Sequence, residues 1–352
     1  MPDNSELRFE PADYRVRLFL SVDLSGSTAF KNSTAGEDQD TGSAPRWVTI
    51  FQQFYTDFPA LFRNKYQRQT NASVGTDGCP ELWKAVGDEL IFCGRISNTK
   101  AAIVALNTFI ATLHLYRKKL LDDRVELNVK GAGWLAAFPE PNRAVQLRAL
   151  DGQADLISAS EALEKAADQS PFDYDFLGKA IDTGFRVAAN SKPERFVLSV
   201  QLARLLAGAS PELGFAYDIR LEGLNTLKGV NRNEPYPMLY IDTLSHLPME
   251  NARRLQREVL RENDPPTRPK LYEFLQEYCA VVGTDEIMLG KDANAAAVPA
   301  PESYTKHRGK IAEHLLSEKG REFDGDAGEE ADSNEDVQIE EPDLEPLSSD
   351  TG

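Results

Sequence analysis

The first regular pattern in the chain is a largely apolar run that starts at Arg15, ends on Asp23 and is followed by small Ser, Gly and Thr residues. Such a run predicts a buried β-strand that ends in a turn. Two further apolar runs, within residues 82–92, flank the pair Gly87-Asp88. They predict a β-hairpin, and glycine at the first loop position is typical of a type II′ turn. The pattern therefore puts two carboxylates, Asp23 and Asp88, at the ends of strands.

An aromatic stripe with helical spacing follows the first turn. It comprises Trp47, Phe51, Phe54, Tyr55, Phe58, Leu61 and Phe62. The spacing predicts an amphipathic helix whose stripe is mostly core, and Pro59 is expected to end or kink it. We expect further helices at 99–121 and 154–167, and strands at 125–138, 196–200, 215–221 and 238–242.

The character of the sequence changes near residue 244. Two amphipathic helices are expected at 251–263 and 270–282, separated by the breaker DPPTRP, and a short helical patch at 310–319. The final stretch has too few apolar residues to fold alone. The predicted organisation is a flexible N-terminus, a catalytic domain, a helical extension, and a linker with a disordered acidic tail, at 1–14, 15–243, 244–290 and 291–352.

The net charge of −17 over 352 residues is unevenly distributed. Residues 322–352 contain 13 acidic and no basic residues, so the rest of the chain carries only −4. No basic stripe stands out, which argues against a nucleic-acid partner. The three cysteines show no paired spacing, and the four histidines are scattered. Without a signal-peptide pattern or a long apolar run, we expect a cytoplasmic protein with no membrane partner.

The two strand-end aspartates are candidate metal ligands. An aspartate at a strand end and one on a neighbouring hairpin can together bind two divalent ions for phosphoryl transfer. The Ser-Gly-Ser-Thr turn after Asp23 would let backbone approach a phosphate at the start of a helix. The alternative for each aspartate is a turn or helix-capping residue chosen for local hydrogen bonding.

A second group of polar residues lies in the segment 174–191. Asp182 and Arg186 are four residues apart and share one face of the predicted helix, and Asp175 precedes the helix. Lys228 lies in an expected strand before a Gly turn, where it can reach a phosphate. The alternatives are an ion pair on a solvated helix face and a lysine that simply faces water.

Four segments, FLSVDLSGST, LWKAVGDELIF, YDFLGKAIDTGFR and LKGV, occur in the order of the motifs of class III nucleotidyl cyclases. The chain resembles that family over residues 15–242. It most resembles the pyrimidine (uridylate) cyclases of bacterial Pycsar antiphage systems, through the aromatic helix and the IDTGFR segment. The resemblance implies an α+β, ferredoxin-like domain with a mixed, mainly antiparallel sheet flanked by helices.

The resemblance also implies roles for individual residues. Asp23 and Asp88 match the metal-binding aspartates, with the Leu24 carbonyl as an extra ligand for two Mn²⁺ or Mg²⁺ ions. The matched substrate-binding and catalytic residues are Lys84 and Asp175 at the base, Asp182 at the ribose, Arg186 at the transition state and Lys228 at the phosphates. Asp182 departs from the family's usual Asn, which puts its ribose role in doubt.

The resemblance further implies a homodimer whose active sites span the interface, and a cyclic nucleotide product that acts on a separate effector protein. Lys84 donates and Asp175 accepts, a pair that suits adenine, cytosine or uracil. Phe51, Phe54 or Tyr55 on the pocket wall would exclude a purine by size. The expected reaction converts UTP to 3′,5′-cyclic UMP and pyrophosphate, with CTP or ATP as alternatives. The rival functions are a diguanylate cyclase and a non-catalytic cyclase-like nucleotide-binding module.

Overall fold

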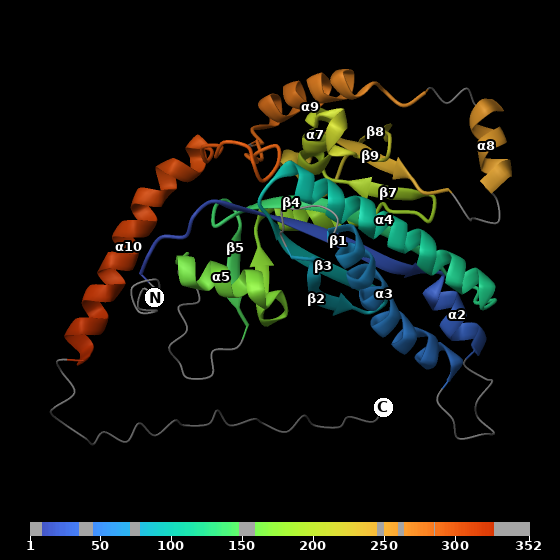
Figure 1. Ribbon diagram of the computed structural model, residues 1–352, viewed down its shortest axis with the longest axis horizontal. Coiled ribbons are helices and arrows are strands. Elements are labelled where there is room, and N and C mark those ends of the chain that lie inside the picture. The colour runs from blue at the N-terminus through green and yellow to red at the C-terminus, as the bar shows by residue number, and fades with distance from the viewer. Residues whose placement is uncertain are drawn as a thin grey trace, which may run out of the picture.

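Strand β1 lies inside a seven-stranded sheet in the computed structural model, which describes residues 9–34, 45–70, 78–147, 159–244, 250–259, 264–284 and 286–326 (Figure 1). In spatial order the strands are β2 (Glu81–Val86), β3 (Glu89–Ile96), β1 (Arg15–Ser25), β4 (Asn128–Phe138), β7 (Arg195–Leu198), β9 (Tyr236–Asp242) and β8 (Ile219–Asn225). A second sheet consists of β5 (Arg143–Gln146) and β6 (Tyr174–Leu177).

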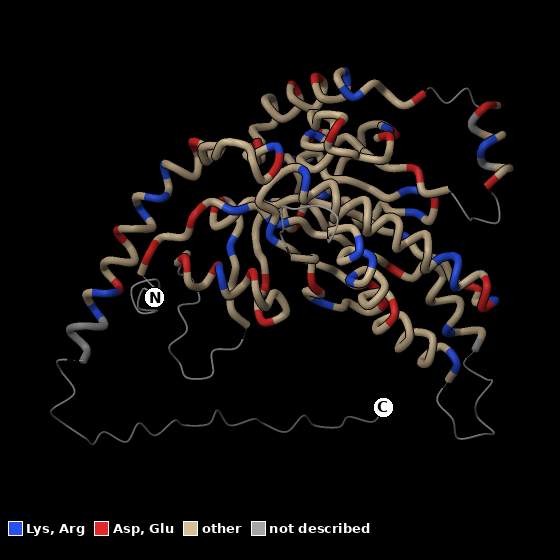
Figure 2. Tube along the Cα trace, viewed as in Figure 1, with Lys and Arg blue, Asp and Glu red and all other residues tan. Residues whose placement is uncertain are grey.

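The helices connect and cover these strands. They are α2 (Ser27–Thr34), α3 (Arg46–Thr70), α4 (Thr99–Asp122), α5 (Glu161–Gln169), α6 (Lys179–Ala188), α7 (Val200–Gly208), α8 (Glu250–Val259), α9 (Arg268–Val282) and α10 (Glu302–Asp326). Among the described residues, none of the helices is both long and apolar enough to cross a membrane. Along this part of the chain, acidic and basic residues are interspersed, without a stripe of one sign (Figure 2).

The first half of the large sheet has a ferredoxin-like topology. The chain runs β1–α2–α3–β2–β3–α4–β4, the strand order is β2-β3-β1-β4, and every neighbouring pair is antiparallel. β7 then pairs in parallel with β4, and β9 and β8 add antiparallel strands. The expected α+β class with a mixed, mainly antiparallel sheet flanked by helices is confirmed.

The two faces of this sheet have different partners. Leu18, Leu20 and Val22 alternate along β1 with Phe19 and Asp23, so the two sets face opposite sides. Phe92, opposite Leu20, packs against aromatic residues of α3 and α4. Phe19 stacks on Trp134 of β4 and contacts residues of β2 and β6 on the other face. Asp23 therefore shares a face with Phe19, away from α3 and α4.

Helix α3 passes straight through a proline. We expected Pro59 to end or kink this helix, yet it is continuous to Thr70, so the expected end is wrong. Proline removes one backbone hydrogen bond from a helix interior. Phe58 and Phe62 are fully buried on either side of it, and their packing in the core holds the helix together across the gap.

Buried ion pairs hold α5 against the sheet. The guanidinium groups of Arg15 and Arg17, from the start of β1, are buried and form ion pairs with three carboxylates of α5. The helix begins at Glu161, later than the expected start at 154, and residues 148–158 lie outside the described ranges. Because a buried charge is costly unless it is paired, this cluster fixes α5 in one position.

The C-terminal extension packs against the domain. Leu271, Leu275 and Cys279 of α9 are buried beside α7, and Figure 1 shows α9 lying over α7. The expected helices are confirmed for residues 251–259 and 270–282, while residues 260–263 lie outside the described part of the chain. Helix α10 is much longer than the expected patch at 310–319. It reaches Asp326, so the first residues of the expected acidic tail are helical, and residues 327–352 lie outside the described part.

The N-terminal segment is fixed from residue 9 on, although 1–14 was expected to be flexible. Ala12 donates a backbone hydrogen bond to Ala159 and accepts one from the Tyr304 hydroxyl of α10. Asp13 forms an ion pair of 2.9 Å with Arg308. These contacts join both ends of the described chain and involve the last part of the segment expected to be flexible, whereas residues 1–8 lie outside the described ranges.

Candidate active site

The Asp88 hairpin closes over the end of β1. Gly87, at the first loop position, has a φ of +63°, which glycine adopts at little cost, and Asp88 has no such value, consistent with a type II′ turn. The carbonyl of Asp88 accepts a hydrogen bond of 3.2 Å from the Leu24 amide. This bond brings the backbone of Asp88 next to the end of β1, beside Asp23.

The register of the sheet places a charged residue on each side of Asp23. Glu89 lies directly opposite it on β3 and Lys130 opposite it on β4. Residues directly opposite each other in antiparallel strands point to the same face, so the three side chains form one row. The Lys130 Nζ is 3.5 Å from Asp23 Oδ2. Sequence reasoning missed both neighbours, although Glu89 directly follows Asp88 and Lys130 interrupts an apolar strand.

The electrostatics of this row favour a bound cation. Partial burial raises the pKa of Asp23, and the nearby Asp88 carboxylate raises it further, while Lys130 opposes both. Burial also raises the pKa of Glu89, and the charges of Asp23 and Asp88 add to that effect. Several carboxylates close together repel one another when ionised. A divalent cation between Asp23 and Asp88 would relieve this repulsion more completely than Lys130 does.

The donor atoms suit Mg²⁺ or Mn²⁺. In a β-strand the N–H and C=O of one residue point to the same neighbouring strand, so the Leu24 carbonyl is directed to the hairpin side, as its amide is. Carboxylate and carbonyl oxygens are the ligands these hard ions prefer. The described residues contain no cluster of three or more Asp, Glu, His or Cys side chains arranged for a metal. Further ligands would come from water or substrate phosphates, as is usual for Mg²⁺.

Helix α6 carries the second group of candidate residues. Its N-terminus is held by Asn142, whose Oδ1 accepts a hydrogen bond of 3.0 Å from the Ala180 amide. Gly184 lies against the Trp134 indole so closely that a Cβ atom there would be 2.5 Å from the ring. The contact at Gly184, which lies between Asp182 and Arg186 in the helix, therefore fixes the position of α6 on the sheet. The side chains of Asp182 and Arg186 both remain exposed.

Residues of α6 and of the turn that contains Lys228 line one cavity of about 630 Å³. Its polar lining residues are Lys179, Asp182, Thr183, Arg186 and Lys228. Within the described part of the chain Asp182 and Arg186 make no ion pair, so the simple salt-bridge interpretation is wrong. The strand expected to hold Lys228 ends at Asn225, and the lysine lies in the following turn. Lys179, which sequence reasoning did not single out, adds a third cation.

Lys84 and Asp175 form an ion pair with each other. Lys84 Nζ is 2.7 Å from Asp175 Oδ1, and about a third of each side chain is exposed. The Lys84 ammonium also lies 3.9 Å from the centre of the Trp83 ring, and Asp175 Oδ1 accepts a second hydrogen bond, from the Phe176 amide. The structure thus brings together the pair predicted to read the base, from strands β2 and β6.

The three aromatic residues predicted for the pocket wall differ in exposure. Phe51 is 4% exposed and packs against Trp47 and Tyr55, with the Lys31 ammonium 4.5 Å from its ring centre. Tyr55 is 36% exposed, and its hydroxyl donates a hydrogen bond to the Gly87 carbonyl of the hairpin. Phe54, the third candidate, is fully buried in the core. Tyr55 is therefore the one with the most surface to offer a ligand, beside Asp88.

The predicted site residues form two groups in one chain. Asp23, Leu24 and Asp88 meet at the end of β1, whereas Asp182, Arg186 and Lys228 line the cavity at α6. Neither Asp23 nor Asp88 is among the residues that line that cavity. One group holds carboxylates suited to a metal ion, and the other holds cations around a cavity.

Comparisons with known proteins give structural similarity alone. The sequence matches no protein-family profile and no curated protein. Solved structures that resemble it include the adenylyl cyclase CyaB from P. aeruginosa, with 14% identity, a TM-score of 0.39, and coverage of 65% of this chain and 94% of that one. The guanylate cyclase domain of RhGC from Catenaria anguillulae in complex with GTP has 12% identity, a TM-score of 0.41 and coverage of 66% and 98%.

A bacterial light-regulated adenylyl cyclase is similar in the same way, with 10% identity, a TM-score of 0.40 and coverage of 69% and 98%. All three TM-scores lie below 0.5. The fold assignment therefore rests on the sheet order and register described above, and the activity is argued from the residues of this chain.

Proposed function

We propose that this chain is a nucleotide cyclase that converts a nucleoside triphosphate to a 3′,5′-cyclic nucleotide and pyrophosphate. The observation that carries the proposal is the pair of complementary, incomplete groups on one chain. One has two carboxylates at a strand end, and the other has Arg186, Lys228 and Lys179 around a cavity large enough for a nucleotide. The order of the sequence motifs supports the same function.

The chemistry assigned to each residue follows from its charge and geometry. Asp23 and Asp88 would hold two divalent ions, which lower the pKa of the ribose 3′-hydroxyl and neutralise the phosphates. The 3′-oxygen bonds to the α-phosphorus as the bond to the pyrophosphate oxygen breaks, and the hydroxyl proton leaves to solvent. Arg186, with no ion-pair partner among the described residues, would stabilise the charge on the α-phosphoryl group.

Lys228 and Lys179 would bind the phosphates, and Asp182 would accept a hydrogen bond from the ribose. A carboxylate at this position must be directed to a hydroxyl, because it would repel the triphosphate. Asp182 is four residues from Arg186 on α6, so both can approach one bound nucleotide from the same helix face.

We assign the complete site to a homodimer. Because the metal carboxylates and the α6 cavity are separate on one chain, two copies would contribute one group each to a shared site. A closed two-fold dimer would then contain two such sites. This arrangement supplies the metal ligands that the α6 cavity lacks.

UTP is the proposed substrate. Lys84 and Asp175 provide one donor and one acceptor, which matches O4 and the N3 proton of uracil. Tyr55, from the group that holds Asp88, would limit the depth available to the base and exclude a purine by overlap. The resemblance to Pycsar cyclases favours uracil over cytosine, and a role in antiphage defence in which cyclic UMP activates a separate effector protein. Cytidylate and adenylate cyclase activities are the alternatives.

The deciding experiment incubates purified protein with each of the four nucleoside triphosphates and Mn²⁺, and identifies the products by mass spectrometry. Cyclic UMP and pyrophosphate from UTP are expected, with slower turnover of ATP and GTP. Cyclic CMP as the main product would overturn only the choice of base. Nucleotide binding without pyrophosphate release from any substrate would instead identify a non-catalytic module.

A further inference from the structure

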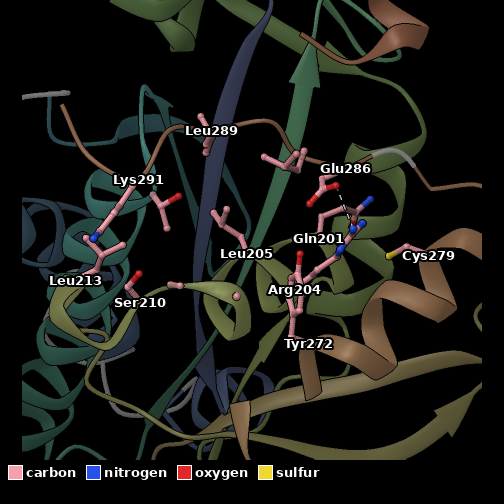
Figure 3. A pocket seen from close by; sticks show the side chains of 14 residues that line it. Gln201, Arg204, Leu205, Ser210, Leu213, Tyr272, Cys279, Glu286, Leu289 and Lys291 are labelled. Atoms are coloured by element: carbon pink, nitrogen blue, oxygen red, sulfur yellow. Dashed lines mark ion pairs between the residues drawn. The ribbon is translucent and has the colours of Figure 1, made fainter. Parts of the chain in front are cut away.

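A separate cavity of about 260 Å³ lies between the domain and the C-terminal extension (Figure 3). Its walls come from α7, the connection that follows it, α9 and the segment 286–291. None of its lining residues belongs to the α6 cavity or to the Asp23 group. The backbone of this segment is firmly anchored, because the carbonyls of Gly290 and Lys291 accept hydrogen bonds from the first amides of α4.

Arg204 of α7 is the main polar group in this cavity. Its side chain is 11% exposed, and one end of its guanidinium forms an ion pair of 3.2 Å with Glu286. The Arg204 Nε is buried and makes no hydrogen bond of good geometry among the described residues, although burial raises the pKa of the Cys279 thiol and the nearby Arg204 guanidinium opposes that rise. A buried donor without a partner costs roughly 1–3 kcal/mol, so this atom marks a place where an acceptor would be stabilising.

Glu286 satisfies Arg204 only in part. Its Oε2 is paired with one terminal nitrogen only, and about half of its side chain is exposed. A guanidinium can bind a carboxylate or phosphate through Nε and a terminal nitrogen together, which is a stronger arrangement than a single contact. A ligand carboxylate that replaced Glu286 on the terminal nitrogen would also reach the Nε donor, which Glu286 does not use.

The rest of the cavity is a mixture of apolar and cationic surface. Figure 3 shows Lys291 on the opposite side from Arg204, with Leu205 and Leu289 between them. Tyr272 of α9 and Leu213 add further apolar surface. Lys291 is paired with Glu212, which does not line the cavity, at 2.5 Å. Both cations therefore already have carboxylate partners, and an anion is favoured at Arg204 because its Nε donor is left over.

We propose that this cavity binds a small organic anion, with its carboxylate on Arg204 and a short apolar body against Leu205, Leu289 and Tyr272. The ligand is distinct from the nucleotide substrate, whose proposed site uses other residues. It would contact α7 of the domain and α9 of the extension at the same time. Binding therefore ties the extension to the domain.

Straight-chain carboxylates from acetate to octanoate test the proposal by isothermal titration calorimetry on the full-length protein, without nucleotide. Each added methylene should tighten binding about fourfold until the cavity is filled. 1-Hexanol, which has the same body without the charge, should bind at least about tenfold more weakly than hexanoate. No binding of any carboxylate, binding independent of chain length, or equal binding of the alcohol overturns the proposal.

Variants identify the site. Arg204→Gln should weaken hexanoate binding about tenfold or more, and Arg204→Lys should lose less because it keeps the charge. Arg254→Gln, on the exposed surface of α8, is the matched control and should bind normally. Ser210→Leu should block binding by filling the cavity while leaving Arg204 intact. Unchanged affinity in a folded Arg204→Gln or Ser210→Leu protein would place the ligand elsewhere. Because no turnover is measured, this outcome is independent of the cyclase proposal.

Discussion

Asp23 and Lys130 lie opposite each other on adjacent strands, with Lys130 Nζ 3.5 Å from Asp23 Oδ2. On the other side of Asp23 is Glu89, and the Asp88 hairpin is close enough to raise the pKa of Asp23. Asp23 therefore has one cation and two carboxylates as neighbours in the absence of a metal. This imbalance leads to predictions about stability as well as activity.

Asp23→Asn should make the metal-free protein more stable and inactive. The pKa of Asp23 is raised, so its charged form is unfavourable in the folded state at neutral pH, and the neutral amide removes that cost. We expect a melting temperature about 2 °C higher without metal, and turnover reduced more than about 100-fold. Mn²⁺ should raise the melting temperature of the wild type but not of the variant. Asp122→Asn, on the exposed end of α4, is the control, and a metal response retained by Asp23→Asn would contradict the metal site.

Acidification should weaken metal binding earlier than an ordinary aspartate would. A carboxylate with a raised pKa keeps its proton to higher pH, and the proton must leave before a metal binds. Metal-dependent turnover should fall on the acid side at a pH above the usual aspartate pKa of 3.8.

The stability of the metal-free protein depends on pH in the opposite sense, because it falls as the pH rises. A group whose pKa is higher in the folded state than in the unfolded state stabilises the fold when it is protonated. This contribution to the free energy of unfolding is complete below the unfolded-state pKa and is lost as the pH rises through the folded-state pKa. The difference in melting temperature between Asp23→Asn and the wild type should therefore grow from about pH 4 to about pH 7. A difference that is constant across this range would show that Asp23 has an unshifted pKa.

Gly184→Ala should damage catalysis through the position of α6. The added Cβ would be 2.5 Å from the Trp134 indole, so the helix must move and carry Asp182 and Arg186 with it. A displacement of this kind should lower kcat/KM by about 100-fold and cost about 1–3 kcal/mol of stability. Gly309→Ala on α10 is the control, since its Cβ would meet no atom within 4 Å. Wild-type kinetics in Gly184→Ala would show that the contact between α6 and Trp134 does not determine the geometry of the active site.

Mixing two inactive variants should restore part of the activity. Asp88→Ala removes a metal ligand, and Arg186→Ala removes the proposed transition-state residue from the other group. In an equal mixture about half of the dimers are mixed, and each has one intact site, so about one quarter of the wild-type rate is expected. Native mass spectrometry must show that mixed dimers form. No recovery at any ratio, despite those dimers, would contradict the shared site.

Tyr55→Ala should relax the choice of base. The side chain is partly exposed beside the hairpin, so its removal enlarges the proposed base pocket and should raise the ATP-to-UTP turnover ratio about tenfold. Tyr55→Phe keeps the ring and should keep the ratio. Phe51→Ala should instead cost about 3–5 kcal/mol of stability, because that ring is buried. A ratio unchanged in Tyr55→Ala would remove this residue from the specificity argument.

Local patterns in the sequence predicted much of the fold and the candidate residues. The Gly87-Asp88 hairpin, the aromatic face of α3 and the shared face of Asp182 and Arg186 all depend on short-range periodicity and turn chemistry. Such features are fixed by a few neighbouring residues, so the sequence alone was sufficient for them. The strand-end pattern already grouped Asp23 with Asp88, and the motif order added the specific functional hypothesis.

Other features depended on contacts between distant segments, and only the tertiary structure decided them. The sequence pattern predicted that α3 would end or kink at Pro59, and the helix does not end there, because packing around Phe58 and Phe62 outweighs one lost backbone hydrogen bond. Lys130 reaches Asp23 only because β4 pairs with β1 in one register, and a slip of one residue would direct it to the other face. The Lys84–Asp175 ion pair likewise joins residues 91 positions apart. Periodicity gives the face on which a side chain lies, whereas strand order and register decide which side chains meet there.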